Sequence, residues 1–316
     1  MPRYRHRLPQ LHGQPLLTDG GIETTLLFHH RIDLPEFATF PLLDRPEHAQ
    51  TLADYSRSFI DLVRASGFGL LLESLTWRAH ADWAGKLGYT ADDLPRIWRE
   101  SIQQLVKLRD AAPASANPLV ISACMGPRRD GYAPDLAMTA DEARAYHAPQ
   151  VRAFAQSEAD LLTAYTLTNP AEAVGIALAA QDAGIPCAIS FTLETDGRLP
   201  SGQPLREAIE HTDQGTDQTP AYYMINCAHP SHFRHVLEPG AAWNNRIQGV
   251  RANASCKSHA ELDEAEHLDI GDPEALARDL AALQERLPRL SVLGGCCGTD
   301  LRHIRCLRDA LLSQPA

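Results

Sequence analysis

Two patterns of apolar and polar positions alternate along the chain. In the first, apolar residues follow one another in short runs, as a strand buried on both faces requires. In the second, apolar residues recur at the spacing of an amphipathic helix, as at Leu276, Leu280 and Leu283. The runs of strand length span residues 15–18, 68–73, 119–124, 160–164, 186–191, 221–226, 247–251 and 290–293. The helical segments span residues 48–66, 92–112, 140–157, 170–183, 205–211, 231–237, 272–287 and 301–312.

Helix start signals agree with this division. Thr139 stands three residues before Glu142, which predicts a capped helix start, and Pro273 follows Asp272 at a first helical position. Eight strand-then-helix units predict an α/β fold, a (β/α)8 TIM barrel. We expect one domain over residues 1–316, with 1–14 as an N-terminal extension. A doubly wound open sheet is the alternative, because a sequence alone does not show whether the sheet closes. The polar segment 212–219 predicts a surface insertion before the sixth strand.

Composition narrows the class of protein. The chain has 316 residues, 44% hydrophobic and 22% charged, which is typical of a globular protein with a large core. The formal net charge of −11 argues against a nucleic-acid partner. No apolar run approaches the roughly 18 residues that cross a bilayer, and no signal-peptide pattern follows the first residues, so we expect a cytoplasmic protein without a membrane partner. The sequence leaves open whether the chain forms a homo-oligomer.

The cysteines give the strongest chemical signal. An odd count of seven cysteines indicates reduced thiols and not a disulfide framework. Cys296 and Cys297 stand side by side among the three glycines of residues 294–298, and Cys227 ends the sixth expected strand. In a barrel, the ends of strands six and eight face the same mouth. Three thiolates there would suit Zn²⁺ and leave its fourth position open. Buried structural cysteines are the alternative, and we assign that role to Cys124, Cys187, Cys256 and Cys306.

These motifs resemble the zinc-dependent homocysteine S-methyltransferase family, which includes betaine–homocysteine methyltransferase and the homocysteine domain of methionine synthase. The resemblance rests on Gly-Gly-Cys-Cys-Gly at 294–298, on the pair Asn226-Cys227, and on Asp19-Gly20-Gly21 after the first strand. The order of strands, motifs and helices matches over nearly the whole chain. The resemblance implies a (β/α)8 barrel, Zn²⁺ on three cysteines, and homocysteine as the methyl acceptor, giving methionine.

The resemblance also implies roles for residues at strand ends. Asp19 would bind the amino group of the acceptor, and the backbone near Gly20 and Gly21 could meet its carboxylate. Asn226 would orient the substrate or satisfy backbone groups. Further candidate substrate contacts at strand ends are Glu73, Thr76, Tyr165, Glu194 and Asn253.

The chain departs from the family pattern at the acceptor. Family members usually have a glutamate after the fourth strand that also binds the amine, and Tyr165 occupies that position here. Glu194, after the fifth strand, could supply the missing carboxylate or could be a solvated loop residue. Met224 stands where the family has glycine, which could narrow the pocket. These changes leave zinc and methyl transfer in place and make the identity of the acceptor thiol an open question.

The expected reaction follows from the charge of such a site. A zinc-bound thiol loses its proton and becomes a nucleophile. The negative charge of four thiolates favours a cationic methyl donor, either a sulfonium such as S-methylmethionine or S-adenosylmethionine, or a quaternary ammonium. Trp77, Tyr132 and Tyr165 are candidate aromatic contacts for that cation, with packing as the alternative. Two rival functions stand beside this one: a methyltransferase component that works with a separate corrinoid-carrying partner, and a non-enzymatic zinc or thiol-binding protein.

Overall fold

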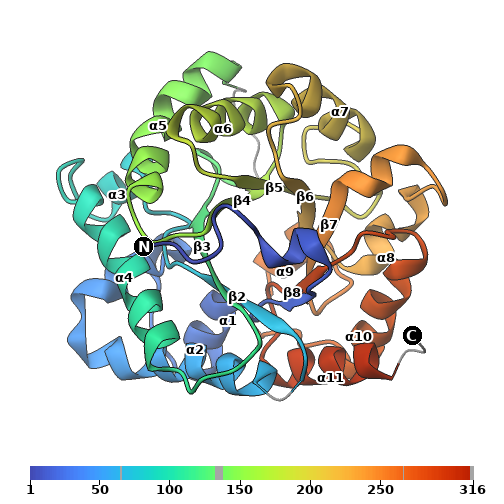
Figure 1. The fold of residues 1–316 in the computed structure, drawn as a ribbon, viewed down its shortest axis with the longest axis horizontal. Helices are drawn as coiled ribbons and strands as arrows, with labels where there is room; N and C mark the ends of the chain where they lie inside the picture. Colours follow the sequence, from blue (N-terminus) through green and yellow to red (C-terminus); the bar gives the residue numbers. More distant parts are fainter. Residues whose placement is uncertain (65, 132–137, 266, 314–316) are drawn as a thin grey trace.

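The chain folds into a closed barrel of eight parallel strands surrounded by helices (Figure 1). The computed structural model describes residues 1–64, 66–131, 138–265 and 267–313. Neighbouring strands in the sequence are neighbours in the barrel, and β8 pairs with β1 to close it. The strands are β1 (Leu16–Leu17), β2 (Gly69–Glu73), β3 (Leu119–Met125), β4 (Leu161–Leu167), β5 (Cys187–Thr192), β6 (Tyr222–Asn226), β7 (Ile247–Ala252) and β8 (Val292–Gly295). This confirms the predicted TIM barrel and excludes the open sheet.

The helices occupy the segments between the strands. They are α1 (Ile22–Thr24), α2 (Ala49–Val63), α3 (Ala81–Lys86), α4 (Leu94–Ala111), α5 (Ala140–Ala155), α6 (Pro170–Ala183), α7 (Leu205–Thr216), α8 (Pro230–Phe233), α9 (His259–Asp263), α10 (Pro273–Ala282) and α11 (Leu301–Leu312). Short 3-10 turns lie at Pro9–His12, Pro35–Phe37, Phe40–Asp44, Pro46–His48, Arg234–Val236, Ala242–Arg246 and Leu283–Glu285, with a π turn at Thr25–His29. None of the described helices has both the length and the apolar character needed to cross a membrane.

Two helix starts and one helix end test the sequence analysis directly. Thr139 accepts from the Glu142 amide in a capping box, and Asp272 caps α10 with proline at the first position, as predicted. The predicted surface insertion at 212–219 is wrong, because α7 continues to Thr216. Thr212 and Thr216 are buried. Their hydroxyls donate to the carbonyls of Ala208 and Thr212, one turn earlier in the helix, at 2.8 and 2.7 Å. Such bonding lets polar residues continue a helix that composition alone marks as a loop.

Apolar side chains fill the barrel from both faces of its strands. Leu17, Leu70 and Leu72 belong to the large core between the strands and the helices. Leu16 and Leu71 alternate with them and belong to a second buried cluster, in the barrel interior, which the other strands extend.

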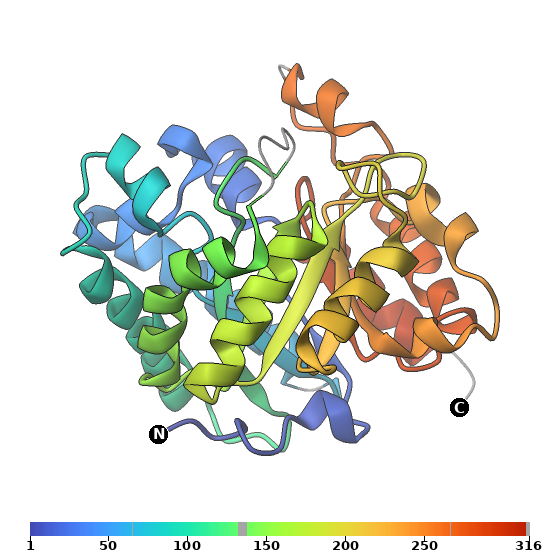
Figure 2. The same ribbon diagram turned by 90° about the horizontal axis from the view of Figure 1, so that it is seen from above.

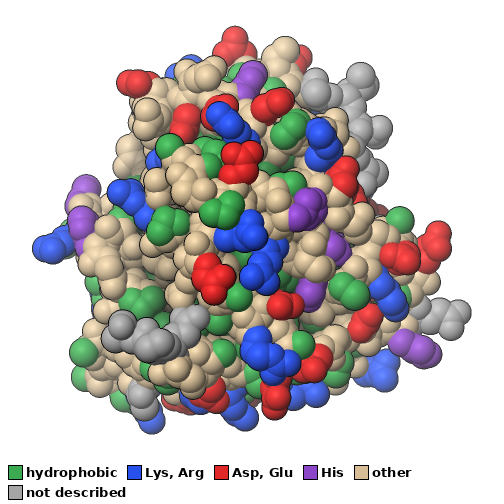
Figure 3. All heavy atoms as spheres, turned by 90° about the vertical axis from the view of Figure 1, so that its right-hand side faces the viewer, with side chains coloured by type: hydrophobic (Ala, Val, Ile, Leu, Met, Phe, Trp, Pro, Cys, Tyr) green, Lys and Arg blue, Asp and Glu red, His purple; other side chains and the backbone are tan. Residues whose placement is uncertain are grey.

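The N-terminal segment covers one end of the barrel and leaves the other for the site. Leu8 joins the interior cluster, and the Arg5 side chain donates to the carbonyls of Ala155 and Ala159 at 2.6 and 3.0 Å. In Figure 2 this segment runs beneath the barrel, whereas α9 lies above it, on the side where the strands end. On one face of the molecule, acidic and basic side chains are mixed (Figure 3).

Candidate active site

Three cysteines from two strand ends meet at the mouth of the barrel. Cys227 follows β6, and Cys296 and Cys297 follow β8. Their sulfur atoms all lie within 4.8 Å of one another, the only such group of potential metal ligands among the residues the structure describes. Hydrogen bonding to Cys227 is the largest cause that holds the pKa of Cys297 well above its usual value. Thiols this close oppose one another's ionisation, so a bound cation would stabilise their thiolate forms.

The backbone of Cys227 is held in an unusual conformation by its neighbours. Its φ is +53°, in the left-handed region that residues with a side chain rarely adopt. Its amide donates to the Arg251 carbonyl at 3.1 Å. Its carbonyl accepts from Asn253 Nδ2 at 3.0 Å and contacts His259 Nε2 at 2.6 Å. These bonds aim the Cys227 sulfur at the other two cysteines.

The glycines of the Gly-Gly-Cys-Cys-Gly segment allow a tight turn against β1 and β7. A Cβ at Gly294 would lie 1.9 Å from the Thr18 hydroxyl, so a side chain there would push the first strand away. Gly298 has φ +80°, which closes the turn after the two cysteines. Within the turn, the Cys296 amide donates to the Ala252 carbonyl at 2.7 Å. The sequence motif therefore encodes the geometry that brings both sulfur atoms to the mouth.

Asn226 links three strand ends beside the cysteines. Its Oδ1 accepts from the Thr166 amide at 2.9 Å and from the Ser190 hydroxyl at 2.6 Å. Its Nδ2 donates to the Thr166 hydroxyl at 2.9 Å. Thr166 also has a positive φ, +62°, so the asparagine stabilises a strained residue on β4 and ties it to the end of β6, directly before Cys227.

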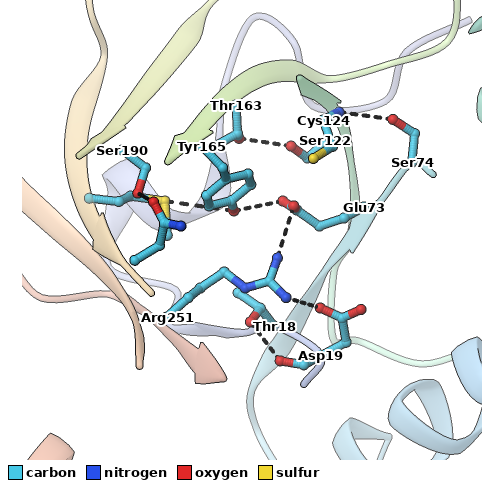
Figure 4. A network of polar contacts seen from close by, with 12 residues as sticks. Thr18, Asp19, Glu73, Ser74, Ser122, Cys124, Thr163, Tyr165, Ser190 and Arg251 are labelled. Carbon is cyan, nitrogen blue, oxygen red and sulfur yellow. Dashed lines mark hydrogen bonds and ion pairs between the residues drawn. The ribbon is translucent and has the colours of Figure 1, made fainter. Parts of the chain in front are cut away.

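A cavity beside the sulfur atoms contains a buried arginine between two carboxylates (Figure 4). Arg251 Nη2 donates to Asp19 Oδ1 at 2.5 Å, and Nη1 donates to Glu73 Oε2 at 3.0 Å. The other oxygens are also bonded: Tyr55 donates to Asp19 Oδ2 at 3.1 Å and Tyr165 donates to Glu73 Oε1 at 2.8 Å. The cavity is lined by these groups and the cysteines, including Asp19, Gly20, Gly21, Glu23, Phe37, Glu73, Trp77, Cys124, Tyr165, Asn226, Cys227, Arg251, Cys296 and Cys297.

Burial disfavours the charged forms of the acids in this cavity. Burial, opposed by the Arg251 charge, raises the pKa of Glu73 to about 7. Burial likewise raises the pKa of Glu23 to about 7 and raises that of Asp19. Burial lowers the pKa of Arg251, but the nearby acids outweigh it and hold the pKa well above its usual value. The guanidinium is therefore the constant charge of the cavity, and at pH 7 the two glutamates are partly protonated.

A second cavity reaches the cysteines from another side. It shares Phe37 and Cys297 with the first and continues along α9. Phe28, Asn253 and Asp269 are among its other lining residues. The two cavities thus meet at Cys297, which would let two different molecules approach the cysteine cluster from different sides.

Comparison with known proteins shows the family to which a chain with this site belongs. The model of the homocysteine S-methyltransferase family matches residues 16–311. The chain belongs to this family. It is 22% identical to a selenocysteine Se-methyltransferase of Brassica oleracea var. italica over 94% of this chain and 89% of that protein. It is also 22% identical to homocysteine S-methyltransferase 1 of Arabidopsis thaliana, over 92% and 91% of the two chains.

A solved structure shows the same fold. The metallated form of the homocysteine methyltransferase MmuM from Escherichia coli superposes with a TM-score of 0.71 at 20% identity, covering 97% of this chain and 99% of that chain. Its oxidised form gives a TM-score of 0.74. Membership of the homocysteine S-methyltransferase family confirms the resemblance seen in the sequence and makes the chain a methyltransferase.

The structure places most of the predicted site residues beside the cysteines. Most of them line the cavity beside the cysteines: Asp19, Gly20, Gly21, Glu73, Tyr165, Asn226, Cys227, Cys296 and Cys297. Asn253 lines the second cavity. Thr76 is not among the lining residues of either cavity; its buried hydroxyl donates to the Cys124 carbonyl at 2.6 Å. Glu194 lies 3.2 Å from His259 Nδ1, behind the Cys227 carbonyl, so it adjoins the backbone of a candidate ligand.

Three features differ from the sequence analysis or were missed by it. Cys256 is exposed, so its assignment as a buried structural cysteine is wrong. Tyr132 lies outside the described residues. Arg251 was missed, although a charged residue at the end of an apolar strand run was a usable signal, because a buried charge needs partners.

Proposed function

We propose that this protein is a zinc-dependent S-methyltransferase that moves a methyl group from a sulfonium or quaternary-ammonium donor to a small thiol. The observation that carries the proposal is the convergence of three sulfur atoms within 4.8 Å beside two cavities. Homocysteine, the acceptor named for the family, is the reference acceptor, and methionine would be its product.

The donor set fits zinc. Three sulfur ligands in a cluster this tight are typical of Zn²⁺, and they leave the fourth tetrahedral position for a substrate. Cys227, Cys296 and Cys297 would hold the ion. When bound, zinc would keep a thiol in its deprotonated, nucleophilic form at neutral pH.

The residues around the cluster would position the reactants. Asn253 and His259 fix the Cys227 carbonyl, which limits how far that ligand can shift. The cavity with Arg251 would hold the acceptor, with its sulfur toward the cysteines. The second cavity, which reaches Cys297 past the ring of Phe37, would admit the donor from the other side, and that aromatic ring could contact its cationic group. The transferred methyl breaks its bond to the donor as it bonds to the acceptor sulfur, and the donor leaves as a neutral thioether or amine.

One assay tests this function directly. Zinc-loaded protein is incubated with homocysteine and, in turn, with S-methylmethionine, S-adenosylmethionine, betaine and dimethylsulfoniopropionate, and methylated thiol is measured by mass spectrometry. The same panel is run with a series of other small thiols. We expect methyl transfer from at least one of these cationic donors, and none with a Cys297→Ala variant. Absence of product with every pair would contradict the proposal.

The assay also separates the rival functions. Transfer from a small donor without any partner protein excludes a component that depends on a corrinoid-carrying subunit. A protein that holds zinc and binds thiols but yields no product would instead be a binding protein. A different acceptor thiol has one specific observation in its favour, the ion pair between Asp19 and Arg251.

A further inference from the structure

Arg251 occupies the part of the acceptor cavity that would otherwise attract a positive charge. Its side chain is only 11% exposed and reaches from β7 between Asp19 on one side and Glu73 on the other. It also donates to the carbonyls of Gly20 and Gly295 at 3.1 and 2.9 Å. Four donor contacts fix the guanidinium in place, and one N–H, on Nη1, has no acceptor among the described residues.

The carboxylates beside Arg251 are already paired with a cation and bonded by tyrosine hydroxyls, while each oxygen keeps a second lone pair. Each oxygen of Asp19 and of Glu73 already accepts a hydrogen bond from an arginine or tyrosine. An ammonium placed against either acid would also lie next to the guanidinium, and like charges in a partly buried cavity repel strongly. The same place suits a neutral group or an anion, which the remaining Nη1 hydrogen can meet.

Glu23 is the remaining acid of this cavity. Because burial raises its pKa to about 7, it carries only part of a negative charge at neutral pH. Burial disfavours the charged form of Glu23, and the full positive charge of Arg251 lies in the same cavity, so Glu23 attracts an ammonium less strongly than an exposed carboxylate would.

We infer that Arg251 is a specificity-determining residue that selects acceptor thiols without an amino group, such as mercapto-carboxylates, over amino-acid thiols. The inference rests on the proposed thiol methylation and names its acceptor class. Tyr165 supports the selection, because its hydroxyl bonds Glu73 and its ring lies 5.2 Å from the guanidinium carbon.

Three matched thiols test the inference. 4-Mercaptobutanoate is homocysteine without its amino group, and 3-aminopropane-1-thiol is homocysteine without its carboxylate. Each is titrated into the protein loaded with cobalt(II) in place of zinc, and binding is followed by the thiolate-to-cobalt absorption band, which requires no methyl donor. We expect 4-mercaptobutanoate to bind about tenfold more tightly than homocysteine, and 3-aminopropane-1-thiol to bind most weakly. Tighter binding of homocysteine than of 4-mercaptobutanoate, or binding of none of the three, would overturn the inference.

Variants assign the preference to the guanidinium charge. Arg251→Gln should shift the ratio of the two dissociation constants toward homocysteine by about tenfold or more, because Asp19 and Glu73 become available to its ammonium. Arg251→Lys keeps a charge and should keep the preference. Tyr55→Phe removes a hydrogen bond from Asp19 without changing charge, so its ratio should stay at the wild-type value. A ratio that Arg251→Gln leaves unchanged refutes the role of Arg251. If thiols bind in the predicted order but no donor yields product, the proposed methyl transfer fails while the selectivity stands.

Discussion

Truncation of Asn226 should affect both stability and metal retention. Asn226→Ala removes three hydrogen bonds, to the Thr166 amide, the Thr166 hydroxyl and the Ser190 hydroxyl. The side chain is 2% exposed, so water cannot readily replace them. At about 1 kcal/mol for each bond, with some further cost for the buried amide left unpaired, the free energy of unfolding should fall by roughly 3–4 kcal/mol. The variant also releases the end of β6 from β4 and β5, directly before Cys227, so zinc affinity should fall as well.

Asn244 provides a matched control for this variant. It is 1% exposed, and its Nδ2 donates to the carbonyls of Glu238 and Arg286 at 2.7 and 3.1 Å, outside the cysteine cluster. Asn244→Ala should lower stability by about 2 kcal/mol and leave zinc affinity unchanged. Urea unfolding and competition with a chromogenic zinc chelator measure the two quantities separately. An Asn226→Ala protein within 1 kcal/mol of wild type, with unaltered zinc affinity, would refute this account of the strand-end link.

Four further results are expected. Cys227→Ala should lose the roughly one zinc per chain that metal analysis of the wild type should show, whereas Cys187→Ala should retain it. The raised pKa of Glu73 means that its burial costs stability as pH rises from 4.5 to about 7, so Glu73→Gln should match wild type near pH 5 and be more stable by about 3 kcal/mol at pH 8 in urea unfolding. Glu194→Gln should leave the KM for the acceptor thiol unchanged, since Glu194 faces His259; a large rise in that KM would mean that Glu194 contacts the acceptor. Thr139→Ala should lower the free energy of unfolding by about 1 kcal/mol through loss of a helix cap, and no change in thermal unfolding would contradict this.

The sequence predicts most of the fold because a parallel barrel repeats one simple pattern. Each of the eight expected strand runs contains or overlaps an observed strand, since strands buried on both faces must be continuously apolar. Composition does not predict the structure correctly where polar residues are buried and their hydrogen bonds are made within the protein. Thr212 and Thr216 continue α7 by bonding their own helix. Short elements such as α3 and α9 have too few residues to show a helical period.

The site is predictable where neighbouring residues define it and unpredictable where its partners come from distant strands. Adjacent cysteines among glycines indicate a metal-binding turn without knowledge of the fold. The ion pair of Arg251 with Asp19 joins residues 232 positions apart, so only the closed barrel brings them together. The side chain of Glu194 likewise contacts His259 of α9, which lies 65 positions away in the sequence, so only the fold shows where that side chain points. Chemistry within one segment can be inferred from sequence, whereas pairing across the barrel requires the structure.

The short first strand gives the barrel a seam that also passes through the site. β1 has two residues and pairs with β8 only through Leu16 opposite Val292 and Leu17 opposite Leu293. Beyond those pairs, the Gly295 amide donates to the Asp19 carbonyl at 3.0 Å, and the Gly21 amide donates to the Thr299 carbonyl at 3.0 Å. A local opening there would separate Asp19 from the cysteine-bearing turn without unfolding the other strands. The exchange rate of the Gly295 amide hydrogen with solvent deuterium should therefore report how often the cavity beside Arg251 opens at this seam, and a thiol bound there should slow that exchange.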